Sequence, residues 1–284
     1  MRKIRHYEGD CFKFHQDVVE RKKSEQLKEH LRTISDVLKE QYDKYGRAFA
    51  GDNLPSLHPL IFDATTKKEL ESLYSYDAQM FRRLKRILTV DENQRPDVYC
   101  PNCTINTINS FDHYLPQTEF SEYIDNPLNL IPSCTECNGH KNKVWRMNGE
   151  RLFLNLYIDD MPQIQYLFVT LSISDNGTMV DAKFEVRNPD GKIDVGLYNK
   201  ISYHYRKLLL CERFSEHRES VLSSLANEIY TLKEVLSDNA LKEVIMKSVA
   251  NERVKYGYNY WRAILQEAVC DNQTVFDFFK RKPY

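Results

Sequence analysis

The sequence predicts an α+β protein that is mainly helical. Apolar residues recur at three- and four-residue steps before residue 95 and again after residue 193, which is the spacing of amphipathic helices. A β-branched and aromatic segment lies between residues 164 and 187 and is typical of a strand hairpin. We therefore expect three regions: a helical N-terminal region over residues 1–95, a cysteine-rich module over residues 96–150, and a hairpin with helices over residues 151–284.

The N-terminal region is predicted to contain two helices. The first is amphipathic, with apolar or aromatic residues on one face from Leu27 to Tyr45. Residues 51–59 contain one glycine and two prolines, which end that pattern. A second helix is expected to open at Thr66, because Thr66 and Glu69 have the spacing of a capping box.

The central module contains two CxxC pairs, Cys100 with Cys103 and Cys134 with Cys137. Four thiolates are the ligand set of a tetrahedral structural zinc. A zinc closed by four protein ligands has no open coordination position for catalysis, so we expect it to hold the two pairs together. Disulfides are disfavoured, because the start of the sequence is polar and has no apolar export segment.

The residues between and after the cysteine pairs include Asp112, His113 and Asn138. The oxygens of Asp112 and Asn138 suit Mg²⁺ or Mn²⁺ better than zinc. The imidazole of His113 titrates near neutral pH and can accept a proton from water. A divalent cation beside a general base is the minimum equipment for phosphodiester hydrolysis. Neighbouring side chains of a regular strand point to opposite faces, so we expect a bend or bulge that lets Asp112 and His113 reach one site.

The order of these residues resembles the HNH (His-Me finger, ββα-metal) endonucleases that have a zinc brace. The shared features are a CxxC pair, Asp112-His113 with a proline soon after, Asn129 followed by leucine, and a second CxxC pair followed by Asn138 and a lysine. The resemblance covers residues 96–146. It implies a central ββα-metal module in which His113 is the general base and Asp112 and Asn138 hold the catalytic metal.

The same resemblance implies roles for other residues of the module. Asn129 would brace the loop behind His113 by hydrogen bonding, and Lys141 would lie on the metal-bearing helix. Some members have a further metal ligand on this helix, and His140 and Asn142 are both available. Asn142 shares a face with Asn138, because it lies one turn later. The other histidines lack ligand-type neighbours and are expected to be structural: His6, His15, His30, His58, His204 and His217.

The C-terminal region is predicted to begin with a hairpin. Residues 164–173 and 178–187 form its strands, and Asp-Asn-Gly at residues 175–177 is a strong turn signal. Helices are expected from residue 193 onward. We expect an interruption near residues 256–258, where a glycine lies between two tyrosines.

The chain of 284 residues has a formal net charge of −1 and a pI of about 6.7, so any nucleic-acid surface must be a local patch. Basic residues do flank the cysteine pairs. Lys141, Lys143 and Arg146 follow the second pair, and we expect them to contact backbone phosphate. The alternative is that they solvate helix faces. The basic residues before the first pair are Arg82, Arg83, Lys85 and Arg86. No apolar run approaches the length of a membrane span, and a cytoplasmic location is expected.

The expected function is metal-dependent hydrolysis of DNA phosphodiester bonds by an HNH-type endonuclease, with Zn²⁺ as structural metal and Mg²⁺ or Mn²⁺ as catalytic metal. In its short basic start and long regions around a central module, the chain is similar to nuclease effectors of bacterial anti-phage systems of the Septu type. That resemblance implies an ABC/SMC-like ATPase as a partner. The large share of the chain outside the module also offers surface for a second copy of the chain. Two alternatives stay open: a zinc-braced nucleic-acid-binding or scaffold protein without catalysis, and a stand-alone restriction or homing-type nuclease.

Overall fold

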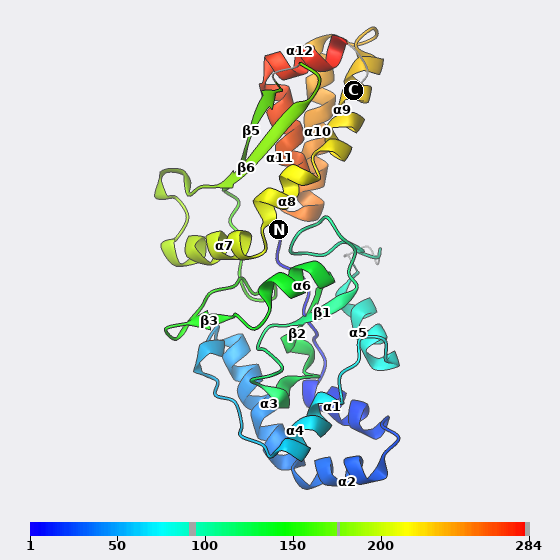
Figure 1. Cartoon of the computed structure of the whole chain (residues 1–284), viewed down its shortest axis with the longest axis vertical. Coiled ribbons are helices and arrows are strands. Elements are labelled where there is room, and N and C mark those ends of the chain that lie inside the picture. Colours follow the sequence, from blue (N-terminus) through cyan, green and yellow to red (C-terminus); the bar gives the residue numbers. More distant parts are fainter. Residues whose placement is uncertain (91–94, 175–176, 282–284) are drawn as a thin grey trace. The chain divides into compact units, whose positions relative to one another are not determined.

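The computed structural model describes residues 1–90, 95–174 and 177–281. The fold class is the predicted one, a mainly helical α+β protein with 53% of the chain in helices and small two-stranded sheets (Figure 1). The chain forms two compact units, one of residues 3–160 and one of residues 1–2 with 161–284. The N-terminal helices and the cysteine-rich module thus belong to the same unit.

The unit of residues 3–160 consists of helices, short strands and 3₁₀ turns. Its helices are α1 (Cys11–Glu20), α2 (Glu25–Thr33), α3 (Ser35–Ala50), α4 (Ala64–Glu71), α5 (Gln79–Leu88) and α6 (Thr135–Lys141). Its strands form two antiparallel pairs, β1 (Ser110–His113) with β2 (Leu130–Ser133) and β3 (Arg146–Met147) with β4 (Glu150–Arg151). The 3₁₀ turns are Leu54–Ser56, Ser121–Tyr123 and Pro127–Asn129.

The apolar stripe from Leu27 to Tyr45 forms two helices and not the single predicted one. α2 ends at Thr33, whose hydroxyl donates to the carbonyl oxygen of His30 at 2.7 Å. A threonine that bonds within its own turn competes with the helical backbone hydrogen bonds. Ile34 then has φ −103° and ψ 8°, outside helical geometry, and α3 begins at the next residue.

The predicted capping box at Thr66 and Glu69 is wrong, because α4 begins at Ala64 with Asp63 as its N-cap. The Asp63 carboxylate accepts from the backbone nitrogens of Thr65 and Thr66, at 2.8 and 3.1 Å. It thereby satisfies two amide groups that have no acceptor within the helix. Thr66 lies inside the helix, and Glu69 pairs with His30 of α2.

One apolar core joins the N-terminal helices to the β1–β2 hairpin. Aromatic rings continue this core to the strand end, since Tyr74 lies edge-on to both Phe81 and His113, with ring centroids 5.0 and 4.7 Å away. The helices therefore support the hairpin that carries Asp112 and His113. Buried members of the core include Phe14, Val18, Leu31, Leu38, Leu70, Phe81, Leu84, Phe111, Ile124 and Leu130.

The second unit contains the predicted hairpin, β5 (Leu167–Ile173) and β6 (Val180–Val186). The strands pair antiparallel, from Leu167 opposite Val186 to Ile173 opposite Val180. The predicted turn residues Asp175 and Asn176 lie outside the described residues. The helices of this unit are α7 (Val195–Lys207), α8 (Leu210–Glu216), α9 (Glu219–Leu232), α10 (Asp238–Tyr256), α11 (Trp261–Asp271) and α12 (Gln273–Arg281).

The predicted interruption near residues 256–258 is confirmed, because α10 ends at Tyr256. Gly257 follows with φ +97°, a conformation that glycine adopts without the steric cost of a Cβ. The hairpin of this unit packs on its helices through Phe184, which lies edge-on to Phe214 and Trp261. Over the ranges that the structure describes, no helix has the length and apolar character needed to cross a membrane.

Candidate functional site

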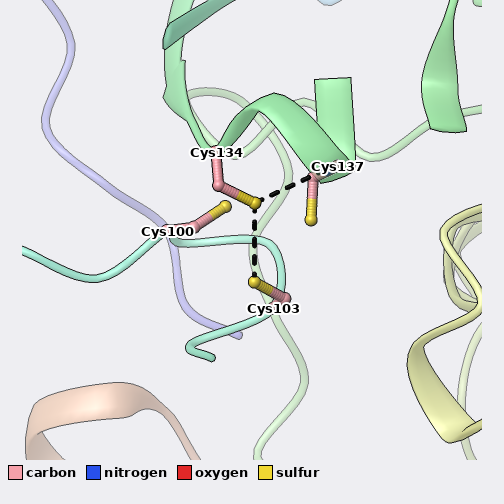
Figure 2. Close-up of side chains that lie close together, drawn as sticks. All are labelled: Cys100, Cys103, Cys134 and Cys137. Atoms are coloured by element: carbon pink, nitrogen blue, oxygen red, sulfur yellow. Dashed lines mark hydrogen bonds between the residues drawn. The ribbon is translucent and has the colours of Figure 1, made fainter. Parts of the chain in front are cut away.

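The two CxxC pairs come together in one buried cluster. Figure 2 shows the sulfurs of Cys100, Cys103, Cys134 and Cys137 converging, and all of them lie within 4.8 Å of one another. The four residues are at most 1% exposed, and none of them forms a disulfide. Cys103 Sγ and Cys134 Sγ are 3.9 Å apart, close to the roughly 3.8 Å between two sulfurs on a tetrahedral zinc with Zn–S of about 2.3 Å. The cluster could therefore hold a zinc ion.

The surroundings of the sulfurs favour the thiolate, the form that binds metal, at Cys103 and Cys134. They raise the pKa of Cys100, chiefly through burial, and that of Cys137, chiefly through hydrogen bonds with the other three cysteines. The hydrogen bond from Cys100 does most to lower the pKa of Cys103, to about 7, and bonds from the neighbouring thiols also lower the pKa of Cys134. Cys134 is the N-cap of α6, and its sulfur accepts from the backbone nitrogen of Cys137 at 3.4 Å. A helix N-terminus further stabilises negative charge on this sulfur.

β1, β2 and α6 form a ββα arrangement beside the cysteine cluster. The two strands pair from Ser110 opposite Ser133 to His113 opposite Leu130, and α6 begins directly after Cys134. α6 returns against β1, where the side-chain nitrogen of Asn138 donates to the carbonyl oxygen of Phe111 at 3.1 Å. This arrangement brings the two segments with predicted catalytic residues next to each other.

Asp112, His113 and Asn138 line one cavity of about 500 Å³. The carboxylate and amide groups provide the oxygen donors that a magnesium or manganese ion prefers. Of the two further ligand candidates, Asn142 lines this cavity, whereas His140 is not among the described residues that do. The remaining lining residues are Pro116, Gln117, Thr118, Thr135, Gly139 and Lys143.

We expected a bend or a bulge at Asp112 and His113, and both side chains reach this cavity without a bulge. The register between β1 and β2 advances one residue at a time, so no extra residue is inserted beside either side chain. Asp112 faces α6, where it contacts Lys141. His113 is the last residue of β1, and its ring reaches the cavity from the end of the strand. The end of β1 at His113 therefore lets both side chains reach one cavity.

The ring of His113 is held with one nitrogen available. Its Nε2 lies 2.8 Å from the carbonyl oxygen of Ile124 and therefore carries the proton, since a carbonyl can only accept. In the neutral ring this leaves Nδ1 unprotonated and able to accept a proton. Burial lowers the pKa of His113 to about 4, and the charge of Lys141 acts in the same direction. The ring is accordingly neutral at pH 7.

Lys141 is a buried partner of the predicted metal ligand Asp112. Its Nζ lies 2.9 Å from Asp112 Oδ1 and also donates to the carbonyl oxygens of His113 and Tyr114, at 2.8 and 3.3 Å. Burial raises the pKa of Asp112, and the charge of Lys141 opposes that shift. The predicted contact between Lys141 and phosphate would require this ion pair to open.

Asn129 makes the hydrogen bonds expected of a loop brace. Its side chain is fully buried; Oδ1 accepts from the backbone nitrogen of Leu115 at 2.7 Å, and Nδ2 donates to the carbonyl oxygens of Leu115 and Tyr123 at 3.1 and 3.2 Å. The hydroxyl of Tyr45 in α3 also donates to Oδ1 at 3.2 Å. Asn129 thus ties both ends of the loop that presents the Ile124 carbonyl to His113.

The other two predicted phosphate contacts differ in their surroundings. Lys143 is exposed and lines the cavity. Arg146 donates to the carbonyl oxygens of Pro55 and Leu57, at 3.0 and 3.2 Å, and pairs with Glu119 at 3.1 Å. Of the three predicted cations, Lys143 is therefore the exposed one that lines the cavity.

The structure also places residues near His113 that the sequence did not single out. His15, expected to be structural, lies with its Nδ1 3.0 Å from Asp125 Oδ2, and the Tyr42 hydroxyl donates to Asp125 Oδ1 at 2.7 Å. Asp125 directly follows Ile124, the hydrogen-bond partner of His113. These residues come from α1, α3 and the inter-strand loop, so no short sequence spacing links them.

Comparisons with known proteins relate the chain to a phage protein. It is 23% identical over 248 residues to the protein ea31 of Escherichia phage lambda, with 83% of this chain and 82% of that protein covered. No protein-family model matches the chain. No solved structure matches it either.

Proposed function

We propose that the protein is a metal-dependent endonuclease of the HNH type that hydrolyses phosphodiester bonds in DNA. In this proposal Zn²⁺ occupies the cluster of four cysteines, and Asp112 and Asn138 hold Mg²⁺ or Mn²⁺. The observation that carries the proposal is the common cavity of Asp112, Asn138 and a neutral His113 whose Nδ1 is free to accept a proton.

The chemistry follows from the positions of these side chains. A bound divalent cation would neutralise charge on the phosphate and on the departing oxygen. His113 Nδ1 takes a proton from the attacking water, while the Ile124 carbonyl holds the opposite edge of the ring. Asn138 uses its amide nitrogen to bond Phe111, which leaves its carbonyl oxygen as the atom suited to a metal.

Local basic surfaces support DNA as the substrate. Lys143 lies at the cavity, and α5 exposes Arg82, Arg83 and Arg86 within one ten-residue helix. With a net charge of −1 for the whole chain, backbone phosphates would have to be neutralised by such patches.

We further propose that the nuclease is an effector of an anti-phage system and acts with an ABC/SMC-like ATPase or with a second copy of itself. A near-neutral chain has little general attraction for DNA, so a partner would have to bring substrate to the cavity. The unit of residues 161–284 contains none of the proposed catalytic residues and offers surface for such an interface. Co-purification with the product of the neighbouring gene and size-exclusion chromatography would detect either partner.

The variant His113→Ala tests the catalytic proposal. Wild-type protein, with its partner added where one co-purifies, should cleave plasmid DNA only with added Mg²⁺ or Mn²⁺, and the variant should lose about 10²- to 10⁴-fold in rate. Zinc content should not change, and the variant should still fold. His140→Ala is the matched control, because His140 lies on α6 but is not among the residues described as lining the cavity.

Each alternative predicts a different result. A normal cleavage rate in His113→Ala would reject His113 as the general base. DNA binding without metal-dependent cleavage by the wild type would favour a zinc-braced binding or scaffold protein. Rapid, sequence-specific cleavage by an isolated monomer would favour a stand-alone restriction or homing-type nuclease.

A further inference from the structure

A carboxylate is buried directly behind the loop that contacts His113. Asp125 is 0% exposed, and its two bonded neighbours, His15 and Tyr42, are 3% and 4% exposed. His15 Nδ1 lies 3.0 Å from Asp125 Oδ2, and the Tyr42 hydroxyl donates to Oδ1 at 2.7 Å. A buried charge that loses its partners is strongly unfavourable, so these contacts hold Asp125 firmly in place.

Asp125 is linked to the ring of His113 through a single peptide group. That group joins Ile124 to Asp125, and its carbonyl oxygen lies 2.8 Å from His113 Nε2. Because a peptide group is planar and rigid, fixing the Cα of Asp125 restricts where the Ile124 carbonyl can point. On the other side, the backbone nitrogen of Asn126 donates to the carbonyl oxygen of Tyr123 at 3.2 Å. The acceptor for His113 is therefore held from both sides.

The negative charge of Asp125 also favours a proton on Nε2 of His113. Burial raises the pKa of Asp125, but the interactions with His15 and Tyr42 outweigh it and lower the pKa, so the group is a carboxylate at neutral pH. A negative charge favours the proton on the nearer edge of an imidazole. Nε2 is the edge that faces the peptide group between Ile124 and Asp125.

We propose that His15, Tyr42 and Asp125 are positioning residues that select the Nε2-protonated tautomer of His113 through the Ile124 carbonyl. Helices α1 and α3 would then belong to the catalytic apparatus, although they lie outside the ββα arrangement. The catalytic consequence rests on the proposed nuclease function, whereas the effect on the tautomer does not.

The tautomer of His113 can be read directly from the ¹⁵N signals of the imidazole in the full-length protein labelled at histidine. Protonated and unprotonated ring nitrogens give separate signals, and those of His113 are assigned by their loss in His113→Gln. We expect wild type to carry the proton on Nε2 alone. Asp125→Asn should make the Nδ1-protonated form detectable, and Tyr42→Phe should do so to a smaller extent. If Asp125→Asn does not fold, the tautomer measured in Tyr42→Phe tests the proposal.

A matched control separates positioning from a general loss of stability. Asp159→Asn weakens another buried ion pair of the same unit, between Arg151 and Asp159 at 2.7 Å with both side chains 4% exposed. It should lower the unfolding midpoint without changing the tautomer of His113. Zinc content should be unchanged in all variants.

Cleavage kinetics give the second measurement. Asp125→Asn should lower kcat by about 10- to 100-fold with little change in KM, because the base is misaligned while substrate contacts are kept. An unchanged tautomer in both Asp125→Asn and Tyr42→Phe would overturn the proposal, whatever the rate. If the variants shift the tautomer but the wild-type protein cleaves no DNA, the positioning network is supported and the nuclease function is rejected.

Discussion

Lys141 and Asp112 form an ion pair inside the candidate active site, with Nζ and Oδ1 2.9 Å apart and side chains only 4% and 8% exposed. Lys141 belongs to α6 and Asp112 to β1, so the pair also fastens the helix to the hairpin. The lysine supplies the positive charge that balances the buried carboxylate. This explains how the Asp112 side chain can be buried in the folded protein.

Replacing Lys141 by methionine should destabilise the protein by about 3–5 kcal/mol, because Asp112 becomes a buried carboxylate without a counter-charge. Urea unfolding of both proteins measures the loss. Added Mn²⁺ should recover part of it, since a cation that binds only the folded state stabilises that state. The double variant Asp112→Asn with Lys141→Met should lose less than the single variant. Equal losses of stability in the single and the double variant would show that the unpaired Asp112 carboxylate is not the cause of the destabilisation.

Purified protein should contain about one zinc per chain, bound by the four clustered cysteines. Cys134→Ser should release it and loosen residues 96–146, because Cys134 both belongs to the cluster and caps α6. Elemental analysis and hydrogen exchange measure these effects. Cys211→Ser, in the other unit and outside the cluster, is the control and should keep its zinc. Full zinc occupancy in Cys134→Ser would contradict the assignment.

Asp112→Asn and Asn138→Ala should raise the Mg²⁺ or Mn²⁺ concentration needed for half-maximal cleavage, since each removes or weakens an oxygen donor. Titrating the metal in a cleavage assay gives this value. Asn142→Ala in the same assay decides whether Asn142, which also lines the cavity, is a ligand. Metal responses identical to wild type in Asp112→Asn and Asn138→Ala would remove both residues from the metal site.

Glu122 should make the protein less stable as the pH rises through about 7. Burial raises its pKa from 4.5 to about 7, so the folded state binds this proton more tightly than the unfolded chain. The stabilisation is complete below pH 4.5 and is lost as the pH passes the folded pKa. Glu122→Gln cannot ionise and can still accept the bond from the Leu60 nitrogen, so it should exceed wild type by about 2–3 kcal/mol at pH 8.

Denaturant unfolding at pH 5 and pH 8 measures this difference. Glu29→Gln, at an exposed position on α2, is the control and should track wild type at both values. A wild-type protein that loses no stability relative to Glu122→Gln between these values would show that Glu122 is not buried in a neutral form.

The amino-acid sequence by itself determined features that depend on short spacings. The two CxxC pairs predicted the buried cluster of four cysteines, because the ligand set of a metal is specified by residue type and by spacing within each pair. The β-branched and aromatic segment with its turn signal predicted the hairpin of β5 and β6, and Gly257 predicted the end of α10. In each case the physical constraint acts within a few residues.

Only the tertiary structure decided which polar groups are buried and with what partner. Lys141, Lys143 and Arg146 all follow the second CxxC pair. Lys141 is nevertheless paired with Asp112, and Arg146 contacts backbone carbonyls and Glu119. His15 and Asp125 are 110 residues apart in the chain. Burial of a charge depends on the packing of distant segments, and a local pattern contains no information about which distant segment will supply the partner.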